Sequence, residues 1–220
     1  MSLIYFRNQG ETSHQEVSDD HPLPVTSVSS FQAFDGSVYS SDIIWKLAAD
    51  GRLFVASDAD QNDMVTGQTS FANTTPTFLL RVPAGTIAVP IFLNLSQSGT
   101  VAGDFISVVI EADDVDRWAS GGTAETVFTP RKAPNIIAQR CSLLSGATAS
   151  SGYGVRIWGA TIAQDVSPAE GAVQGPFWKP EMPYFLEGPA SLLIYTYAGS
   201  TGPTWLWSIG WAEFDSVLAA

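Results

Sequence analysis

The sequence has few of the residues that build metal sites and disulfides. It contains one cysteine, Cys141, and two histidines, His14 and His21, which lie in a polar N-terminal stretch with no cysteine near them. A single cysteine cannot form a disulfide within the chain, and a zinc site of the Cys/His type needs more ligands than this. We therefore expect no metal, no other cofactor and synthesis in a reducing cytosol.

Basic residues are also scarce. Ten Lys and Arg face twenty-two Asp and Glu, which gives a formal charge of −12 and a pI near 4.3. This balance opposes binding to nucleic acid through a basic patch. No window approaches the roughly 18 apolar residues of a membrane span, and residues 1–7 lack the basic start and long apolar run of a secretory signal. We expect neither nucleic acid nor membrane as a partner.

Catalytic motifs are missing too. The chain has no Gly-x-Ser-x-Gly, Ser-x-x-Lys, His-Glu-x-x-His, phosphate loop or Gly-x-Gly-x-x-Gly, and no histidine after His21. General acid–base chemistry would depend on carboxylates alone. We therefore expect a protein that is not an enzyme; the alternative is a carboxylate-only glycan hydrolase.

Three neighbouring acids, Asp113, Asp114 and Asp116, are the candidates for such a hydrolase. A glycosidase places its two carboxyl groups roughly 5 to 10 Å apart across a cleft, which neighbours on one loop do not establish. We interpret the cluster as a turn in which Arg117 neutralises one acid.

Short β-type runs dominate what is present. Nineteen Gly and thirteen Pro separate segments rich in Val, Ile, Thr and aromatics, and no segment keeps helical spacing for three turns. The pattern predicts an all-β fold, a single antiparallel β-sandwich that is jelly-roll-like. We expect strands at 78–82, 87–95, 105–111, 126–128, 136–144, 153–163, 192–197 and 205–214.

Local signals refine this prediction. Asp50-Gly51 between 43–47 and 52–56 predicts a hairpin, because Asp-Gly suits a type I′ turn. Pro90 predicts an edge position or a bulge in its strand. The strand at 105–111 is apolar on both faces apart from Ser107, so we expect it to be covered on both sides, in the sandwich interior or at a subunit contact.

The simplest division of the chain is an extended N-terminal arm, residues 1–30, and a β-sandwich domain, residues 31–220. Residues 164–189 form a long proline-rich loop without strand pattern. Loops of this length are seldom without a role. Its aromatic residues, including Phe177, Trp178 and Tyr184, are candidates for partner contact.

Three tryptophans alternate along the last predicted strand. Trp205, Trp207 and Trp211 share one face, whereas the other face carries small residues and one leucine. We expect this stripe to be buried in the core or an interface. The alternative is an exposed platform for a sugar.

Two further candidates have simple interpretations. Asp58, Asp60 and Asn62 match the first ligands of an EF-hand loop, but Asp63 replaces its glycine and Thr69 its closing glutamate. We interpret this segment as a solvated acidic loop; the alternative is a looser Ca²⁺ site. Cys141 reads as a small core residue.

One resemblance rests on residues 16–26, which contain His21-Pro22-Leu23-Pro24-Val25. A polar arm ending in this phrase before a β-rich domain resembles N-terminal regions of tailed-bacteriophage virion structural proteins, including head decoration and fibre-type subunits. Residues 82–90 are similar to strand entries of viral jelly rolls. The resemblance implies a virion structural subunit, assembled in the host cytoplasm, that decorates or cements the capsid through protein contacts.

The expected partners are other copies of the chain and the major capsid protein or other virion proteins. The two prolines favour an extended connector, and the apolar run before it should dock rather than stay exposed. The resemblance favours a trimer as the homo-oligomer. A carbohydrate-binding receptor-recognition module, using Trp178, Tyr184 or the tryptophan stripe, is the rival interpretation. The expected contact residues of the arm are Leu3, Ile4, Tyr5, Phe6, Pro22, Leu23 and Pro24.

Overall fold

The computed structural model divides the chain into two compact units, Met1–Lys46 and Leu47–Ala220. The division comes after Lys46, later than the end of the arm expected at residue 30. The structure describes residues 5–6, 15–16, 30–32, 38–40, 43–58, 64–98, 105–130, 138–163, 174–199 and 202–216.

The described part of the first unit contains two short antiparallel pairs and residues 43–46, which begin a helix. β1 (Tyr5–Phe6) pairs with β2 (Gln15–Glu16), and β3 (Ser30–Gln32) pairs with β4 (Val38–Ser40). Tyr5 and Phe6 are described here by backbone alone. The other expected contact residues of the arm, Leu3, Ile4, Pro22, Leu23 and Pro24, lie outside the described residues.

The predicted hairpin around Asp50-Gly51 is wrong in its first half. Ile43–Ala49 form a helix, α1, and only the second half is a strand, β5 (Leu53–Ser57). Gly51 has a φ of 70°. Its N–H donates to the Ala48 carbonyl at 3.1 Å, and the N–H of Arg52 donates to the Leu47 carbonyl at 2.9 Å. These two bonds form a glycine C-cap, so Asp50-Gly51 ends a helix instead of turning a hairpin.

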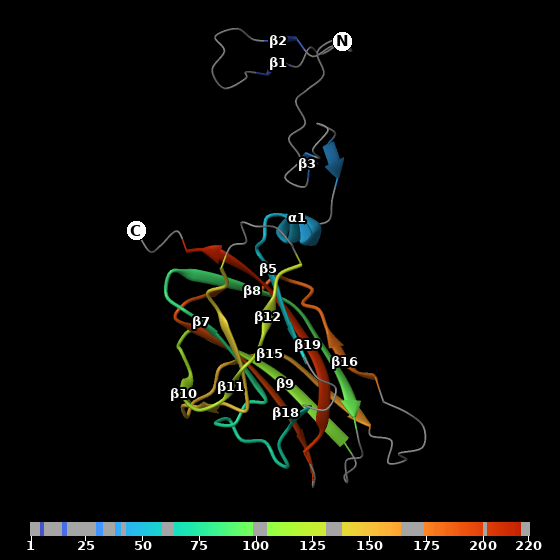
Figure 1. The fold of residues 1–220 in the computed structure, drawn as a ribbon, viewed down its shortest axis with the longest axis vertical. Coiled ribbons are helices and arrows are strands. Elements are labelled where there is room, and N and C mark those ends of the chain that lie inside the picture. Colours follow the sequence, from blue (N-terminus) through green and yellow to red (C-terminus); the bar gives the residue numbers. More distant parts are fainter. Residues whose placement is uncertain are drawn as a thin grey trace. The chain divides into compact units, whose positions relative to one another are not determined.

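The second unit is an antiparallel β-sandwich, as predicted (Figure 1). One sheet has the order β11-β13-β7-β18-β9-β15, and the other β12-β5-β19-β8-β16, with β17 beside β8 and β6 beside β19. The strands not yet bounded are β6 (Val65–Thr66), β7 (Phe78–Val82), β8 (Thr86–Ser98), β9 (Phe105–Asp113), β10 (Trp118–Ser120), β11 (Thr123–Ala124), β12 (Val127–Phe128), β13 (Ser142–Ser145), β14 (Thr148–Ala149), β15 (Val155–Ala163), β16 (Gln174–Trp178), β17 (Leu186–Glu187), β18 (Ala190–Ala198) and β19 (Thr204–Asp215).

Eight of these strands follow the jelly-roll order. They form β5-β19-β8-β16 in one sheet and β7-β18-β9-β15 in the other. The chain passes between the sheets at each step except from β9 to β15, which gives the interlocked Greek keys of a jelly roll. The segment between β9 and β15 adds β11 and β13 beside β7 and β12 beside β5, while β10 pairs with β14.

Residues 164–189 are not the strandless loop that was expected. Their described part contains β16, which pairs with β8 from Gln174 to Trp178, and β17, which pairs with Ala88 and Ile87 of β8. The prolines of this segment concealed both strands, because proline normally lowers the expectation of a strand.

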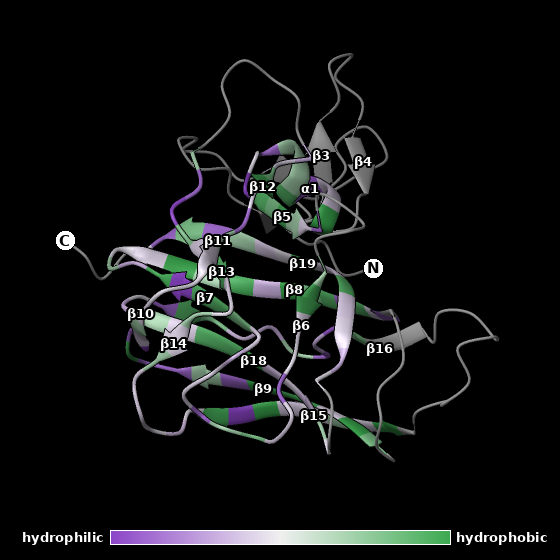
Figure 2. Ribbon diagram, turned by 60° about the horizontal axis from the view of Figure 1, so that its bottom comes forward, coloured by the Kyte–Doolittle hydropathy of each residue, from purple (hydrophilic) through white to green (hydrophobic). Residues whose placement is uncertain are grey.

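The main core lies between the two sheets, and Figure 2 shows hydrophobic residues along the strands of both. A second cluster covers the outer face of β7, β9 and β18, where Leu79, Val109, Leu193 and Tyr195 are buried with Phe71 against them. β9 is therefore covered on both faces by residues of its own chain. This confirms the expectation that the strand is covered on both sides, and it needs no subunit contact to be so.

Pro90 pairs with Trp211 of β19 on one side. On its other side β17 reaches only Ile87 and Ala88, and β16 begins to pair at Leu93. The register with β19 also shifts at this point: Gly210 faces Phe92, but Trp211 faces Pro90. This is a β-bulge, the second of the two predicted explanations for a proline in the strand.

Candidate functional site

The tryptophan stripe faces inward. Trp205 and Trp211 are 0% exposed and Trp207 is 5% exposed, and all three belong to the core between the sheets. The prediction of a buried stripe is confirmed, and an exposed sugar platform on this face of β19 is excluded.

The three aromatics expected on the 164–189 loop do not share one environment. Trp178 is 4% exposed and belongs to the core, where its ring lies 6.5 Å from that of Trp158. It is therefore unsuitable as a contact on the surface, and the interpretation of it as a loop aromatic is wrong, because it lies in β16. Phe177, its neighbour on the strand, is 60% exposed, and Tyr184 is partly buried against the core.

The acidic cluster is divided between two arginines. Arg117 Nη1 donates to Asp113 Oδ2 at 2.7 Å, which confirms the expectation that Arg117 neutralises one acid of the cluster. Arg81 binds Asp116, and its guanidinium lies 4.5 Å from the centre of the Trp118 ring. In the described parts of the chain no three His, Cys, Asp or Glu side chains group as metal ligands, and no helix is long and apolar enough to cross a membrane.

Cys141 is a buried core residue, 1% exposed, as expected. Burial, and then the carboxylate of Glu213, raise the pKa of its thiol far above the ordinary value. Glu213 accepts hydrogen bonds from the backbone N–H of Arg140 at 2.7 Å and of Cys141 at 3.1 Å. A thiol that stays protonated is a poor nucleophile.

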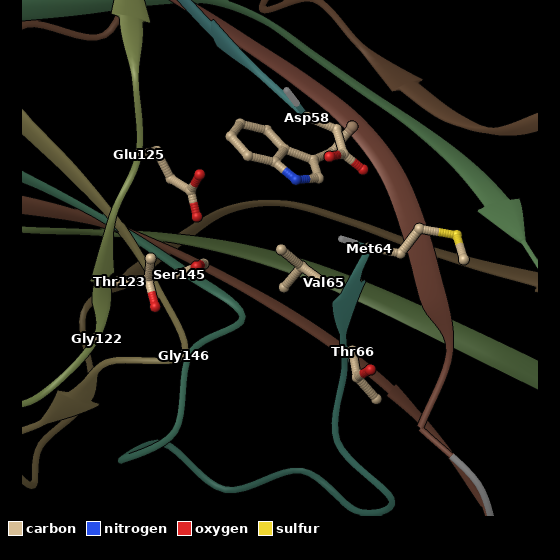
Figure 3. Close-up of a pocket in the computed structure, with 10 residues that line it drawn as sticks. Asp58, Met64, Val65, Thr66, Gly122, Thr123, Glu125, Ser145 and Gly146 are labelled. Carbon is tan, nitrogen blue, oxygen red and sulfur yellow. The ribbon is translucent and has the colours of Figure 1, made fainter. Parts of the chain in front are cut away.

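A hollow of about 480 Å³, the polar pocket, opens between β6, β11 and β19. In Figure 3, Thr123, Glu125 and Ser145 come from one side and Asp58, Val65 and Thr66 from the other. The full lining is Asp58, Met64, Val65, Thr66, Gly122, Thr123, Glu125, Ser145, Gly146 and Trp207.

Backbone hydrogen bonds hold both acidic residues of the polar pocket. The N–H of Asp58 donates to the Trp207 carbonyl at 3.2 Å, and the N–H of Glu125 donates to the Leu143 carbonyl at 2.9 Å. Thr123 and Ser145 are direct cross-strand partners in β11 and β13. The pocket therefore presents carboxylates and hydroxyls from strands whose register is fixed.

A second hollow, the apolar groove, has a volume of about 550 Å³ and lies where the end of β9, the start of β15 and β17 meet. Its large exposed side chains are Tyr153 at 77%, Val155 at 72% and Phe185 at 66%. Asp113, Asp114 and Glu187 also line it. Exposed apolar side chains gathered in one hollow, with acids beside them, are typical of a protein-contact surface.

No protein-family model matches this chain, and neither does a curated protein or a solved structure. The two hollows therefore have to be interpreted from their own chemistry.

Sequence reasoning found few of the residues that line these hollows. The sequence makes Asp58 a candidate ligand of a calcium loop, and the structure places it at the wall of the polar pocket. Residues 59–63, which include the other two candidates Asp60 and Asn62, lie outside the described residues. Tyr184 was singled out and lines the apolar groove. Glu125, Tyr153 and Phe185 carried no motif. Only the strand pairing of distant segments brings them to a hollow.

Proposed function

We propose that this chain is a non-enzymatic structural subunit of a tailed-phage virion, a capsid decoration or cement protein or another head-associated subunit, which works through protein–protein contacts. The jelly-roll strand order supports this, since the fold is common among viral capsid proteins. Fold analogy alone does not give function. The observation that carries the proposal is the apolar groove.

The groove favours a partner of definite chemistry. Tyr153, Val155 and Phe185 leave large apolar surfaces in water, which a soluble protein usually covers with a partner. Asp114 and Glu187 beside them, on a chain of charge −12, favour a partner surface that combines apolar and basic side chains. The expected partner at this groove is therefore another virion protein, foremost the major capsid protein, rather than a second acidic copy.

The experiment measures binding to capsids of the encoding phage that were assembled without this chain. Wild-type protein should sediment with the capsids. The double variant Tyr153→Ser with Phe185→Ser should bind at least about tenfold more weakly, because aromatic anchors carry much of the energy of such contacts. Phe128→Ser, which removes another aromatic residue that is 50% exposed but lies outside the groove, is the matched control.

The outcomes separate clearly once a cooperative melt has shown that each variant is folded. Loss of binding in the groove variant alone supports the proposal. Equal binding by all three proteins, or no binding by the wild type, contradicts it.

The proposal includes self-association through the arm, residues 1–30, with a trimer as the expected form. Light scattering of the full chain and of a chain without these residues tests it, with a cooperative melt to show that the shortened chain folds. The full chain should have the mass of an oligomer and the shortened chain that of a monomer. If the shortened chain keeps the oligomer mass of the full chain, self-association does not depend on the arm.

A further inference from the structure

The indole N–H of Trp207 differs in its hydrogen bonding from those of Trp205 and Trp211. Trp205 donates from Nε1 to Thr196 Oγ1 at 2.9 Å, and Trp211 donates from Nε1 to Glu213 Oε1 at 2.8 Å. Trp207 Nε1 is buried and finds no hydrogen-bond partner among the described residues. Leaving a buried N–H unpaired costs free energy, so an unpaired donor at the wall of a pocket points to a ligand that would accept from it.

The Trp207 ring is held firmly. It is 5% exposed and packs against Phe78, with ring centres 4.7 Å apart and an angle of 52° between the planes. Its backbone carbonyl accepts from Asp58, another residue of the pocket wall. The indole therefore cannot easily turn away to find another acceptor, and its N–H remains a fixed donor of the polar pocket.

The remaining lining sets the charge of the ligand. Asp58 and Glu125 contribute carboxylates, and none of the described residues that line the pocket is Lys, Arg or His. An anion would accept from Trp207 but would be repelled by both carboxylates. An ammonium group would suit the carboxylates but has no lone pair to accept from the indole.

A hydroxyl group meets both demands, because it donates one hydrogen bond and accepts others. Thr66, Thr123 and Ser145 add protein hydroxyls that can pair in either direction. The ligand therefore needs several hydroxyls at fixed spacing and no charge. A volume of about 480 Å³ lies within the range of about 300–1,000 Å³ that small-molecule sites occupy.

We propose that the polar pocket binds a neutral carbohydrate, with Trp207 Nε1–H donating to a sugar hydroxyl and Asp58 and Glu125 accepting from others. This site differs from the exposed tryptophan platform that the sequence raised as an alternative, because the indole here acts through its edge. It also lies apart from the apolar groove, so it does not depend on capsid binding.

The experiment follows the tryptophan indole N–H signals of the ¹⁵N-labelled full chain by NMR while single sugars are added. The probes are glucose, galactose, mannose and N-acetylglucosamine, with glucuronate as the anionic counterpart of glucose. The Trp207 signal is assigned as the one that disappears in Trp207→Phe. At least one neutral sugar should shift this signal, and glucuronate should bind at least about tenfold more weakly than glucose if glucose is a ligand.

Two variants test the site itself. Trp207→Phe keeps an aromatic ring against Phe78 but removes the donor, and should weaken sugar binding about tenfold. Trp211→Phe is the matched control, because it removes a buried indole N–H of the same strand outside the pocket. If Trp207→Phe does not fold, the double variant Thr123→Val with Ser145→Ala leaves the indole in place, and it should also weaken binding.

The inference is overturned if no neutral sugar moves the Trp207 signal, if glucose binds and glucuronate binds equally well, or if a folded pocket variant binds as the wild type does. The groove variant Tyr153→Ser with Phe185→Ser should keep full sugar binding. Its loss of sugar binding would place the sugar in the groove and also contradict the inference.

Discussion

Arg117 and Asp113 form a buried ion pair on the outer face of the six-stranded sheet. Nη1 of the guanidinium lies 2.7 Å from Asp113 Oδ2, and the two side chains are 3% and 12% exposed. The same guanidinium donates from Nε to the Ser150 carbonyl at 3.0 Å and from Nη2 to the Gly152 carbonyl at 2.8 Å. One side chain thus ties the segment before β15 to the end of β9.

We predict that Arg117→Met strongly destabilises the sandwich. Methionine fills similar space but leaves the Asp113 carboxylate and two backbone carbonyls without their donors. Removing one partner of a buried ion pair costs about 3–5 kcal/mol. Urea denaturation, followed by tryptophan fluorescence, measures the change in the free energy of unfolding.

Arg81→Met is the control for this prediction. Arg81 and Asp116 also form an ion pair, but their side chains are 32% and 34% exposed, and exposed pairs contribute at most about 1 kcal/mol. An equal effect of both substitutions would show that burial of the Arg117 pair does not decide its contribution.

The pair of Arg81 and Asp116 leads to a prediction on pH. Hydrogen bonds from Arg81 lower the pKa of Asp116 more than burial raises it. A carboxyl group whose pKa is lower in the folded chain stabilises the fold above its unfolded value, near pH 4, and this contribution disappears as the pH falls through the folded value. Asp116→Asn should therefore cost up to about 1 kcal/mol at pH 6 and progressively less as the pH falls below about 4.

Urea denaturation of Asp116→Asn and wild type at pH 6 and pH 2 measures this difference. The exposed neighbour Asp114 offers the control Asp114→Asn. A difference between Asp116→Asn and wild type that stays the same from pH 6 to pH 2 would contradict the prediction.

Alternation of side chains allowed the sandwich to be predicted from the sequence, but not every element. Trp205, Trp207 and Trp211 occupy alternate positions on one strand, so their common inward face follows from strand geometry alone. The prediction of a strand at residues 43–47, before Asp50-Gly51, was wrong because a short apolar segment fits a helix and a strand equally well. The helix ends in a C-cap at Gly51, and Asp50-Gly51 would suit a hairpin turn equally well.

Neither candidate site could be predicted from the sequence, because the residues that line each one come from distant segments. The polar pocket combines Asp58, Glu125, Ser145 and Trp207 from four segments that only the sheet order brings together. The sequence predicted that Trp207 is buried. Whether its N–H finds an acceptor depends on which side chains lie opposite in space, which no periodicity determines.

We predict that Cys141 is unreactive in the folded protein. Burial and the nearby Glu213 carboxylate raise the pKa of its thiol, so that little thiolate forms at pH 8. Labelling with Ellman's reagent should be more than about tenfold slower in buffer than in urea, because a raised pKa of even one unit removes nine-tenths of the thiolate. Since the chain has one cysteine, the labelled fraction reports this site alone. Rapid labelling of protein with a native melting curve would contradict the prediction.

The last prediction concerns a buried polar group between the sheets. Thr196 of β18 accepts from Trp205 Nε1 of β19 at 2.9 Å, and its Oγ1 lies 2.9 Å from Thr77 Oγ1, which also accepts from the Thr196 N–H at 3.0 Å. Thr196 is 0% exposed and Thr77 is 3% exposed. This group joins the two sheets by hydrogen bonds between buried side chains.

Thr196→Val keeps the shape of the side chain but removes the oxygen that Trp205 needs. A buried donor left without its acceptor costs about 1–3 kcal/mol, so the variant should unfold at lower urea concentration with an unchanged slope. Thr161→Val is the matched control, because the Thr161 hydroxyl pairs with Ser107 on an exposed surface at 3.2 Å, and its loss should change the free energy of unfolding by no more than about 0.5 kcal/mol. In the folded variant the Trp205 indole N–H signal should also move in the NMR spectrum, since the hydrogen bond that fixes its shift is lost. Equal stability of the two variants, or an unmoved Trp205 signal, would show that this hydrogen bond does not contribute to joining the sheets.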